Sequence, residues 1–316
     1  MKADEVKNVC GQVAVEVEKA IIGKRSVVER VIAAMLCDGH VLFEDFPGLA
    51  KTMLAKSTAA ATGCVFKRVQ FTSDLMPADI TGTYVLNPKS GSFELRRGPV
   101  FTNVLLADEI NRAPPKTQSA LLEAMQERQV TLEGESQTLQ RPFVVLATQN
   151  PIEYEGTYPL PEAQIDRFLM KLSVGYPEKA DEIEILKRRK ARGKDEPDIA
   201  MVASAQKLLE MQAFVETVHI DPSIMEYCAE ITRKTRGHGQ VEIGASPRGS
   251  LALMRLSCAM AAMAGRDYVL PDDVKSIAVE ALAHRIILKP DPWIKGIKAE
   301  VVVQKVLEEV PVPKVK

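Results

Sequence analysis

A pattern that could bind phosphate lies at residues 44–52. The apolar run 41–43 leads into EDFPGLAKT, in which a Pro/Gly turn is followed by Lys51 and Thr52 at the start of a predicted helix. Backbone N–H groups at a helix N-terminus lack intrahelical partners and carry partial positive charge, so they attract phosphate. Lys51 would reach the β- and γ-phosphates, and Thr52 would offer its hydroxyl to Mg²⁺. The predicted cradle consists of Pro47, Gly48, Leu49, Ala50, Lys51, Thr52 and Met53.

Two residues depart from the phosphate-loop pattern G-x-x-x-x-G-K-[ST]. Asp45 and Ala50 stand where this pattern has glycines. The alternative interpretation is an ordinary turn that caps a helix and leaves Lys51 in solvent. A carboxylate at position 45 would also repel a triphosphate. We therefore expect the Asp45 side chain to turn away from the loop; otherwise Asp45→Gly would tighten nucleotide binding.

Acidic and amide side chains follow two further apolar runs. Run 104–107 is typical of a strand buried on both faces, and it ends in Asp108 and Glu109. Asp108 could hold Mg²⁺, and Glu109 could polarise an attacking water. Asn150, after the run 143–147, could position the same water. The alternatives are a solvated or ion-paired acid pair and an Asn-Pro turn without a ligand role.

The pattern of apolar residues predicts the elements that position these side chains. Apolar residues recur at helical spacing in 6–21 and 27–36, ahead of the first strand. Five strand-like segments alternate with helical ones, which favours a doubly wound α/β (αβα) domain with a parallel five-stranded sheet and its ligand at the carboxyl ends of the strands. These segments are 41–43, 65–71, 104–107, 143–147 and 168–174.

Two hairpins and a domain boundary complete the predicted organisation. Turn residues between short strands indicate hairpins at 74–98 and 129–139. A Gly-Tyr-Pro sequence at 175–177 marks a boundary, after which helical patterns predominate and 237–247 reads as a loop. We predict one αβα domain over residues 1–175 and a smaller, mostly helical domain over residues 176–316.

Composition limits the classes of partner. The 316 residues include 41 Lys and Arg against 42 Asp and Glu, a net charge of −1, which gives no general attraction to nucleic acid or anionic membranes. The five cysteines form no C-x-x-C pair, so buried thiols in a reducing compartment are the better interpretation. Apolar segments of membrane-spanning length and signal cores are lacking. We expect a cytoplasmic protein.

Three motifs resemble the signature of one family. DEINRAPPKTQSALLEAMQE at 108–127, ATQNP at 147–151 and LPEAQIDRF at 160–168 are similar to the MoxR family of AAA+ ATPases. The order and spacing of the match extend from about residue 21 to residue 284. The resemblance implies a nucleotide-binding P-loop (AAA+) domain with a helical lid domain, and ATP hydrolysis that depends on Mg²⁺.

The resemblance also implies roles for single residues. Lys51 and Thr52 would be the phosphate-loop pair, with Thr52 and Asp108 on Mg²⁺. Glu109 would be the catalytic base, and Asn150 the first sensor of the γ-phosphate. The two hairpins would face the central pore of a ring.

Two arginines and one backbone segment complete the implied nucleotide site. Arg167 resembles the arginine finger that reaches the ATP of the neighbouring subunit, and Arg248 resembles the second sensor on the lid. A guanidinium can offset the charge that develops on phosphate oxygens. Arg167 could instead simply pair with an acid such as Asp166, and Arg248 could start a helix without a ligand. Ile22 and Gly23 would pass beside adenine, although helix breaking alone explains this glycine.

The implied assembly is a homo-oligomer, a hexameric ring that remodels or matures partner proteins together with a von Willebrand factor A domain partner. Two alternatives stay open. One is a nucleotide-dependent switch or scaffold with little turnover, and the presence of Glu109, Asn150 and Arg167 argues against it. The other is a DNA motor or loader, which near-neutral charge and 5% aromatic content support poorly.

Overall fold

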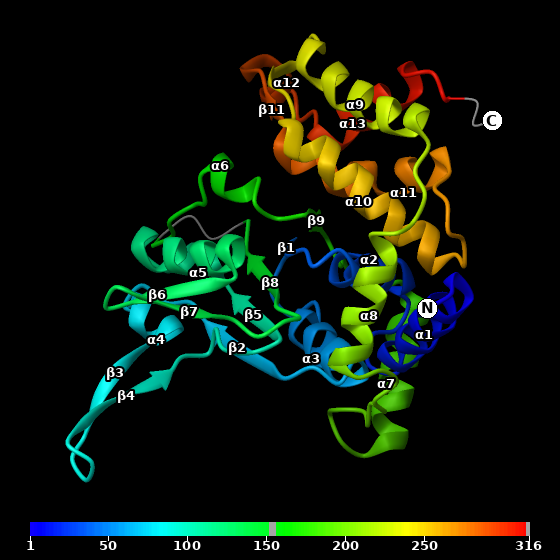
Figure 1. The fold of residues 1–316 in the computed structure, drawn as a ribbon. Coiled ribbons are helices and arrows are strands. Elements are labelled where there is room, and N and C mark those ends of the chain that lie inside the picture. Colours follow the sequence, from blue (N-terminus) through cyan, green and yellow to red (C-terminus); the bar gives the residue numbers. More distant parts are fainter. Residues whose placement is uncertain (152–155, 314–316) are drawn as a thin grey trace.

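A parallel five-stranded sheet forms the centre of the first domain (Figure 1). The computed structural model describes residues 1–151 and 156–313. The strands lie side by side in the order β2-β5-β8-β1-β9, and each neighbouring pair is parallel. The predicted doubly wound sheet is therefore confirmed. Its strands are β1 (Val41–Glu44), β2 (Phe66–Gln70), β5 (Val104–Asp108), β8 (Val144–Gln149) and β9 (Met170–Leu172).

Alternating residues of the central strands enter two separate hydrophobic cores. On β5, Val104 and Leu106 belong to one core, whereas Leu105 and Ala107 belong to the other. Successive side chains of a strand point to opposite faces, so a strand covered on both sides needs apolar residues at every position. This explains the uninterrupted apolar runs that predicted the strands.

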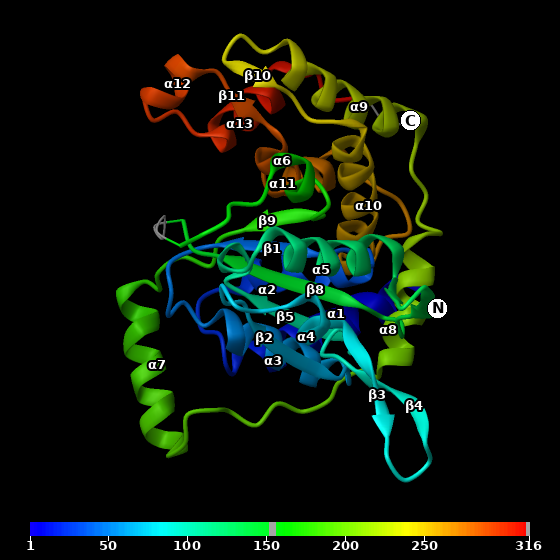
Figure 2. The same ribbon diagram turned by 90° about the vertical axis from the view of Figure 1, so that its left-hand side faces the viewer.

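Helices cover both faces of the sheet (Figure 2). The first core includes residues of the two N-terminal helices and of the helix that follows the phosphate loop. The second core includes Ile80 and residues of the helix after β5. The helices in this order are α1 (Ala3–Glu18), α2 (Arg25–Leu36), α3 (Lys51–Ala61), α4 (Pro77–Thr81) and α5 (Pro115–Glu127), with the 3₁₀ turn η1 (Ile110–Arg112) before α5.

Both predicted hairpins are present. β3 (Gly82–Asn87) pairs with β4 (Ser92–Arg97), and β6 (Gln129–Leu132) pairs with β7 (Glu135–Thr138). The β3–β4 hairpin projects away from the sheet (Figure 1). Its base is tight: a Cβ on Gly82 would lie 2.2 Å from the Arg96 carbonyl, and one on Gly98 would lie 2.2 Å from the Ile80 carbonyl.

Two helices follow the sheet before the lid. α7 (Lys179–Arg192) has no buried residue among its described positions and stands along the edge of the αβα domain (Figure 2). α8 (Ala205–Val215) packs on α2, where Gln212 Nε2 donates to the Met35 carbonyl at 2.7 Å. The domain boundary near residue 175 stays a prediction, because both helices lie beside the first domain although they follow that point.

A short helix, α6 (Glu162–Ile165), precedes β9, and the helices after α8 form the part called the lid below. They are α9 (Pro222–Gly237), α10 (Pro247–Met263), α11 (Pro271–Leu282), α12 (Pro290–Ile294) and α13 (Ala299–Glu309), with the 3₁₀ turn η2 (Ala283–Arg285). The prediction of a loop over 237–247 was wrong in part, because β10 (Val241–Ile243) pairs there with β11 (Ile287–Leu288). Within the described residues, every helix is too short or too polar to cross a bilayer.

Candidate functional site

The carboxyl ends of β1, β5 and β8 meet at a cavity of about 490 Å³. The structure brings together the whole predicted cradle, 47–53, with both predicted acids and the predicted first sensor. Their meeting follows from topology, because the carboxyl ends of parallel strands share one edge of the sheet. The described residues lining this phosphate pocket are Asp45, Pro47, Gly48, Leu49, Ala50, Lys51, Thr52, Met53, Lys56, Arg68, Gln70, Asp108, Glu109, Thr148, Gln149, Asn150 and Glu196.

Lys51 is buried at the first turn of α3. Its Nζ donates to the Phe46 carbonyl at 2.8 Å and to the Asp45 carbonyl at 3.3 Å. Burial lowers the pKa of Lys51, while the carboxylates of Asp45, Asp108 and Glu109 act in the opposite direction. The ammonium group therefore lies within the loop, facing the acids across the pocket.

Asp45 is part of the phosphate-pocket lining, but its carboxylate is bonded to residues 173–175, which agrees with the expectation that it turns away from the loop. Its Oδ1 accepts from Ser173 Oγ at 2.6 Å and from the Gly175 amide at 3.2 Å, and its Oδ2 accepts from the Val174 amide at 2.6 Å. The carboxylate thus caps the end of β9 and ties the phosphate loop to residues 173–175. Backbone amides satisfy a charge that would otherwise repel a triphosphate.

Ala50, the second departure from the motif, has φ +55°, in the left-handed region. An L-residue pays a steric cost of roughly 1–2 kcal/mol there, which explains why the phosphate-loop pattern has glycine at this position. The helix α3 begins at the next residue. Residue 50 therefore adopts the conformation that glycine adopts most easily, although the motif glycine is missing.

Asp108 ends β5 with both carboxylate oxygens bonded. Oδ1 accepts from Thr148 Oγ1 at 2.6 Å, and Oδ2 accepts from Arg68 Nη2 at 2.7 Å and Nε at 3.1 Å. Carboxylate and hydroxyl oxygens are the ligands that Mg²⁺ prefers, so Asp108 with Thr52 in the same pocket fits this ion.

Glu109 also sits in the left-handed region, with φ +55°. Its Oε2 accepts from Gln70 Nε2 at 2.7 Å and from Arg112 Nη1 at 2.9 Å, while its amide donates to Thr148 Oγ1 at 2.8 Å. Strained backbone clusters at functional sites. Thr148 Oγ1 thus bonds to the Asp108 carboxylate and to the Glu109 backbone amide, which holds the end of β5 against β8.

Sequence reasoning missed several residues of this pocket. Arg68 and Gln70 flank Val69 near the carboxyl end of β2, and Thr148 lies near the end of β8. A polar side chain at the carboxyl end of a predicted parallel strand was the available signal. Lys56 and Glu196 form an ion pair of 2.5 Å, a long-range contact with no local sequence signal.

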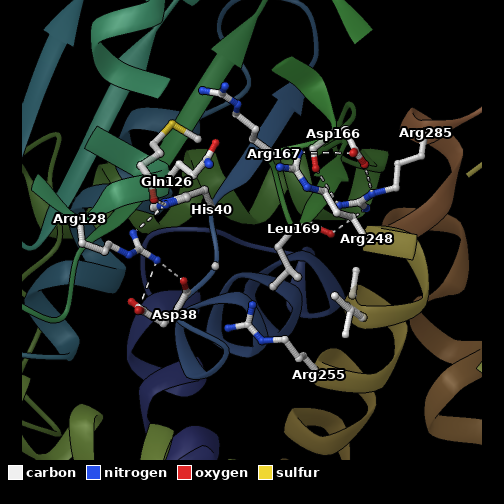
Figure 3. Close-up of a pocket in the computed structure, with 14 residues that line it drawn as sticks. Asp38, His40, Gln126, Arg128, Asp166, Arg167, Leu169, Arg248, Arg255 and Arg285 are labelled. Atoms are coloured by element: carbon white, nitrogen blue, oxygen red, sulfur yellow. Dashed lines mark hydrogen bonds and ion pairs between the residues drawn. The ribbon is translucent and has the colours of Figure 1, made fainter. Parts of the chain in front are cut away.

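Arg167 and Arg248 lie together in a second pocket of about 270 Å³ between the sheet domain and the lid (Figure 3). The described linings of the two pockets have no residue in common. Arg248 therefore lies outside the phosphate pocket of its own chain, and its role as the second sensor stays a prediction. The arginine pocket is rich in positive charge, since its lining holds two acids, Asp38 and Asp166, and five arginines, Arg128, Arg167, Arg248, Arg255 and Arg285.

A contact with Asp166 holds Arg248 in this pocket. Asp166 Oδ2 accepts from Ser246 Oγ at 3.2 Å and pairs with Arg248 Nη1 at 3.5 Å, so the start of α10 is held beside the Arg167 segment. Ser246 also caps α10, because its hydroxyl accepts from the Arg248 amide at 3.2 Å.

Ile22 and Gly23 lie between α1 and α2 rather than in the phosphate pocket. They are linked to the phosphate loop through the next residue: Lys24 Nζ donates to the Tyr176 carbonyl at 2.8 Å, and the Tyr176 ring lies 6.1 Å from the Phe46 ring. Their contact with adenine stays a prediction.

Two family models match this chain, one in the sheet domain and one in the lid. A model of the ATPase family associated with various cellular activities (AAA) matches residues 40–170, and an AAA lid domain model matches residues 233–306. The protein YeaC of Bacillus subtilis is 46% identical over 310 residues, covering 98% of this chain and 97% of the relative. The chaperone MoxR1 of Mycobacterium tuberculosis is 43% identical, covering 95% and 81%.

A solved structure extends the similarity to three dimensions. The crystal structure of a protein from Cytophaga hutchinsonii, described as an ATPase, matches with a TM-score of 0.92 and 40% identity. The match covers 99% of this chain and 97% of that one. It therefore includes the sheet domain, α7, α8 and the lid.

Proposed function

The chain belongs to the MoxR family of AAA+ ATPases, and on this basis we propose that it hydrolyses ATP to ADP and phosphate in a Mg²⁺-dependent reaction. We also propose that it works as a subunit of a homo-oligomeric, hexameric ring. One observation carries the proposal: the phosphate loop, both acids and Asn150 line a single pocket at the carboxyl edge of the sheet.

The residues of this pocket divide the work of phosphoryl transfer. Lys51 and the amides at the start of α3 hold the phosphates, and Thr52 and Asp108 would hold Mg²⁺, which neutralises phosphate charge when bound. Glu109 accepts the proton of the attacking water. Asn150, 8% exposed at the end of β8, orients that water toward the γ-phosphate.

The position of Arg167 and Arg248 supports the ring. Both arginines lie outside the phosphate pocket of their own chain, in a positively charged pocket. Head-to-tail contacts of identical subunits close into rings. In such a ring, we propose, this pocket faces the nucleotide of the neighbour, so Arg167 acts as the finger and Arg248 as the second sensor in the same direction.

The process that ATP hydrolysis drives is proposed from the name of a relative. One relative carries the name chaperone, which supports remodelling or maturation of protein clients. A von Willebrand factor A domain partner and a cytoplasmic location belong to the same proposal. Nucleic acid is the less favoured client because the net charge is −1.

The proposed reaction is tested by steady-state phosphate release. Glu109→Gln keeps the size of the side chain and removes the base, so turnover is expected to fall at least ~10²-fold while ATP binding, measured by titration calorimetry, persists. Unchanged phosphate release would show that Glu109 is not the catalytic base. A pull-down with this ATP-bound variant would then identify retained clients.

The ring is tested by mixing two inactive variants. Lys51→Ala is expected to abolish ATP binding but keep Arg167, whereas Arg167→Ala keeps the phosphate loop. Mixed rings place some intact loops against intact fingers, so activity should return to about a quarter of the interfaces in an equal mixture. A mixture as inactive as its components would contradict an arginine supplied by the neighbour.

A second candidate function, a nucleotide-dependent switch with little turnover, is favoured by the contacts of Glu109. Gln70 and Arg112 both donate to the same carboxylate oxygen, which leaves this base occupied in the single chain. The two functions differ in concentration dependence: specific activity that rises as the protein assembles supports the ATPase, whereas negligible turnover at every concentration supports the switch.

A further inference from the structure

The lid residue Arg285 grips the backbone on both sides of Arg167. Its side chain is 3% exposed, and its Nε donates to Asp166 Oδ1 at 2.8 Å. Nη2 donates to the carbonyls of Phe168 at 2.7 Å and Asp166 at 3.3 Å. Asp166 and Phe168, which these donors bind, directly precede and follow Arg167. Figure 3 shows Arg285 beside Asp166.

The remaining donors of Arg285 are used as well. Nη1 donates to the Leu169 carbonyl at 3.2 Å and to the Ala281 carbonyl in the preceding helix. An arginine has five N–H donors in a rigid plane, and here five contacts are present. Lysine, a point charge with three donors, could not reproduce this arrangement.

The Asp166 carboxylate connects Arg285 to Arg248. One carboxylate oxygen binds Arg285, and the other binds Ser246 and Arg248 at the start of α10. The α10 helix packs tightly against Leu282, since a Cβ on Gly249 would lie 2.8 Å from Leu282 Cδ2, and it also lies close to the Arg285 stem, at 3.6 Å from Cδ. Lid and finger segment thus share one polar cluster around the buried Arg285 side chain.

We infer that Arg285 is a positioning residue that couples the orientation of Arg167 and Arg248 to the lid. The inference rests on the proposed function, in which Arg167 reaches the ATP of the neighbouring subunit. Arg285 itself touches no nucleotide in this scheme. It fixes the carbonyls of residues 166, 168 and 169, so a lid movement that carries Arg248 displaces Arg167 with it.

The expected effect is kinetic. A misplacement of about 1 Å can lower the rate of a reaction roughly 10²-fold. Arg285→Gln should therefore lower kcat by about that factor while the KM for ATP changes little, because the phosphate pocket of the same chain is a separate cavity. Arg285→Lys should restore part of kcat by keeping the charge beside Asp166.

Subunit mixing separates this role from a general loss of structure. Arg285→Gln subunits keep an intact phosphate pocket, and Lys51→Ala subunits keep an intact finger. In equal mixtures, about a quarter of the interfaces combine the two intact halves, and activity should return toward that level although each variant alone is nearly inactive.

Arg30→Gln is the matched control. Arg30 also ties the lid to the first domain, with Nε 3.4 Å from Glu280 Oε1 and Nη2 on the Ser276 carbonyl. These contacts lie on α11, away from residues 166–169. Loss of this arginine should leave kcat within about twofold of wild type, because its partners lie neither in the finger segment nor in the lining of either pocket.

The outcomes distinguish the inference from the proposed function. If Arg167→Ala and Lys51→Ala complement each other but Arg285→Gln and Lys51→Ala do not, the positioning role is overturned and the trans-acting finger stands. If neither mixture recovers activity, the proposed finger fails and the inference with it. Should Arg285→Gln not fold, Arg285→Lys enters the same mixture, and a wild-type kcat for that variant overturns the inference.

Discussion

Asp45 Oδ1 accepts a hydrogen bond from Ser173 Oγ at 2.6 Å, which joins the start of the phosphate loop to the end of β9. The carboxylate occupies a motif position that ordinarily holds glycine. Two backbone amides bind the same carboxylate, so its charge stabilises the position of the loop. The residue that departs most from the phosphate-loop pattern therefore anchors this loop.

Asp45→Asn should weaken nucleotide binding instead of tightening it. The amide replaces a charged acceptor that binds three donors, and hydrogen bonds to charged groups contribute about 1.5–3 kcal/mol. The free energy of unfolding should fall by that amount in urea titrations, and ADP affinity measured by calorimetry should fall as well. Ser173→Ala, which removes one donor, should cost about 1 kcal/mol. Tighter ADP binding at unchanged stability would contradict this role.

Ala50→Gly should stabilise the protein. Glycine removes the steric cost of φ +55° but increases the entropy of the unfolded chain, which leaves a net gain of about 0.5–1 kcal/mol. ATP turnover should persist. The control, Ala60→Gly on the exposed side of α3, should instead lose about 1 kcal/mol. Equal losses in both variants, measured by urea unfolding, would show that residue 50 is unstrained.

Gln70→Ala should raise ATP turnover at low protein concentration. The variant removes one of the donors that occupy Glu109 Oε2, and a hydrogen bond of about 0.5–1.5 kcal/mol corresponds to a rise of roughly 2- to 10-fold. Phosphate release per subunit is the measurement. Gln12→Ala, on the exposed face of α1, should change nothing. A fall in turnover would mean that Gln70 orients the base productively.

Acidification should destabilise the protein through His40. Burial lowers the pKa of His40 from 6.5 to about 3, and the neighbouring Arg128 guanidinium acts in the same direction. Below about pH 6.5 the unfolded chain therefore binds a proton that the folded chain excludes, so stability is full above that pH and is lost as pH falls toward about 3. Between pH 7 and pH 5 this amounts to about 2 kcal/mol.

The measurement compares urea unfolding at the two pH values. In His40→Asn, the difference in unfolding free energy between pH 7 and pH 5 should shrink by about 2 kcal/mol. Phe143→Leu is the control, because Phe143 packs edge-on against the His40 ring at 5.9 Å and carries no proton. It should lower stability equally at both pH values. An unchanged pH difference in His40→Asn would assign the acid sensitivity elsewhere.

Sequence patterns predicted most of the sheet domain because its strands are covered on both faces. Continuous apolar runs precede Asp108 and Asn150, so both residues could be assigned to the same edge from the order of the chain alone. Short elements carry no such pattern: β10 and β11 have three and two residues, too few to show periodicity.

Contacts between distant segments could not be predicted in the same way. The location of Arg248 depends on how the lid docks, and four of the contacts of Arg285 are made with residues more than 100 positions away. A single arginine at the end of a helix has no local signature of its partners. The separation of the arginine pocket from the phosphate pocket therefore depends on how the whole chain folds. It could not be predicted from any short stretch of sequence.

The close backbone contacts at the base of the β3–β4 hairpin fix its orientation relative to α4. At Gly82 and Gly98 the backbones approach so closely that not even a methyl group fits, so the strands cannot slide against α4. Ile80 of α4 is fully buried at the base of the hairpin. It packs in the same core as Leu105 and Ala107 of β5, the strand that ends in Asp108. The rigid base of the hairpin is therefore connected, through the core that Ile80 shares with Leu105 and Ala107, to the strand that ends in Asp108.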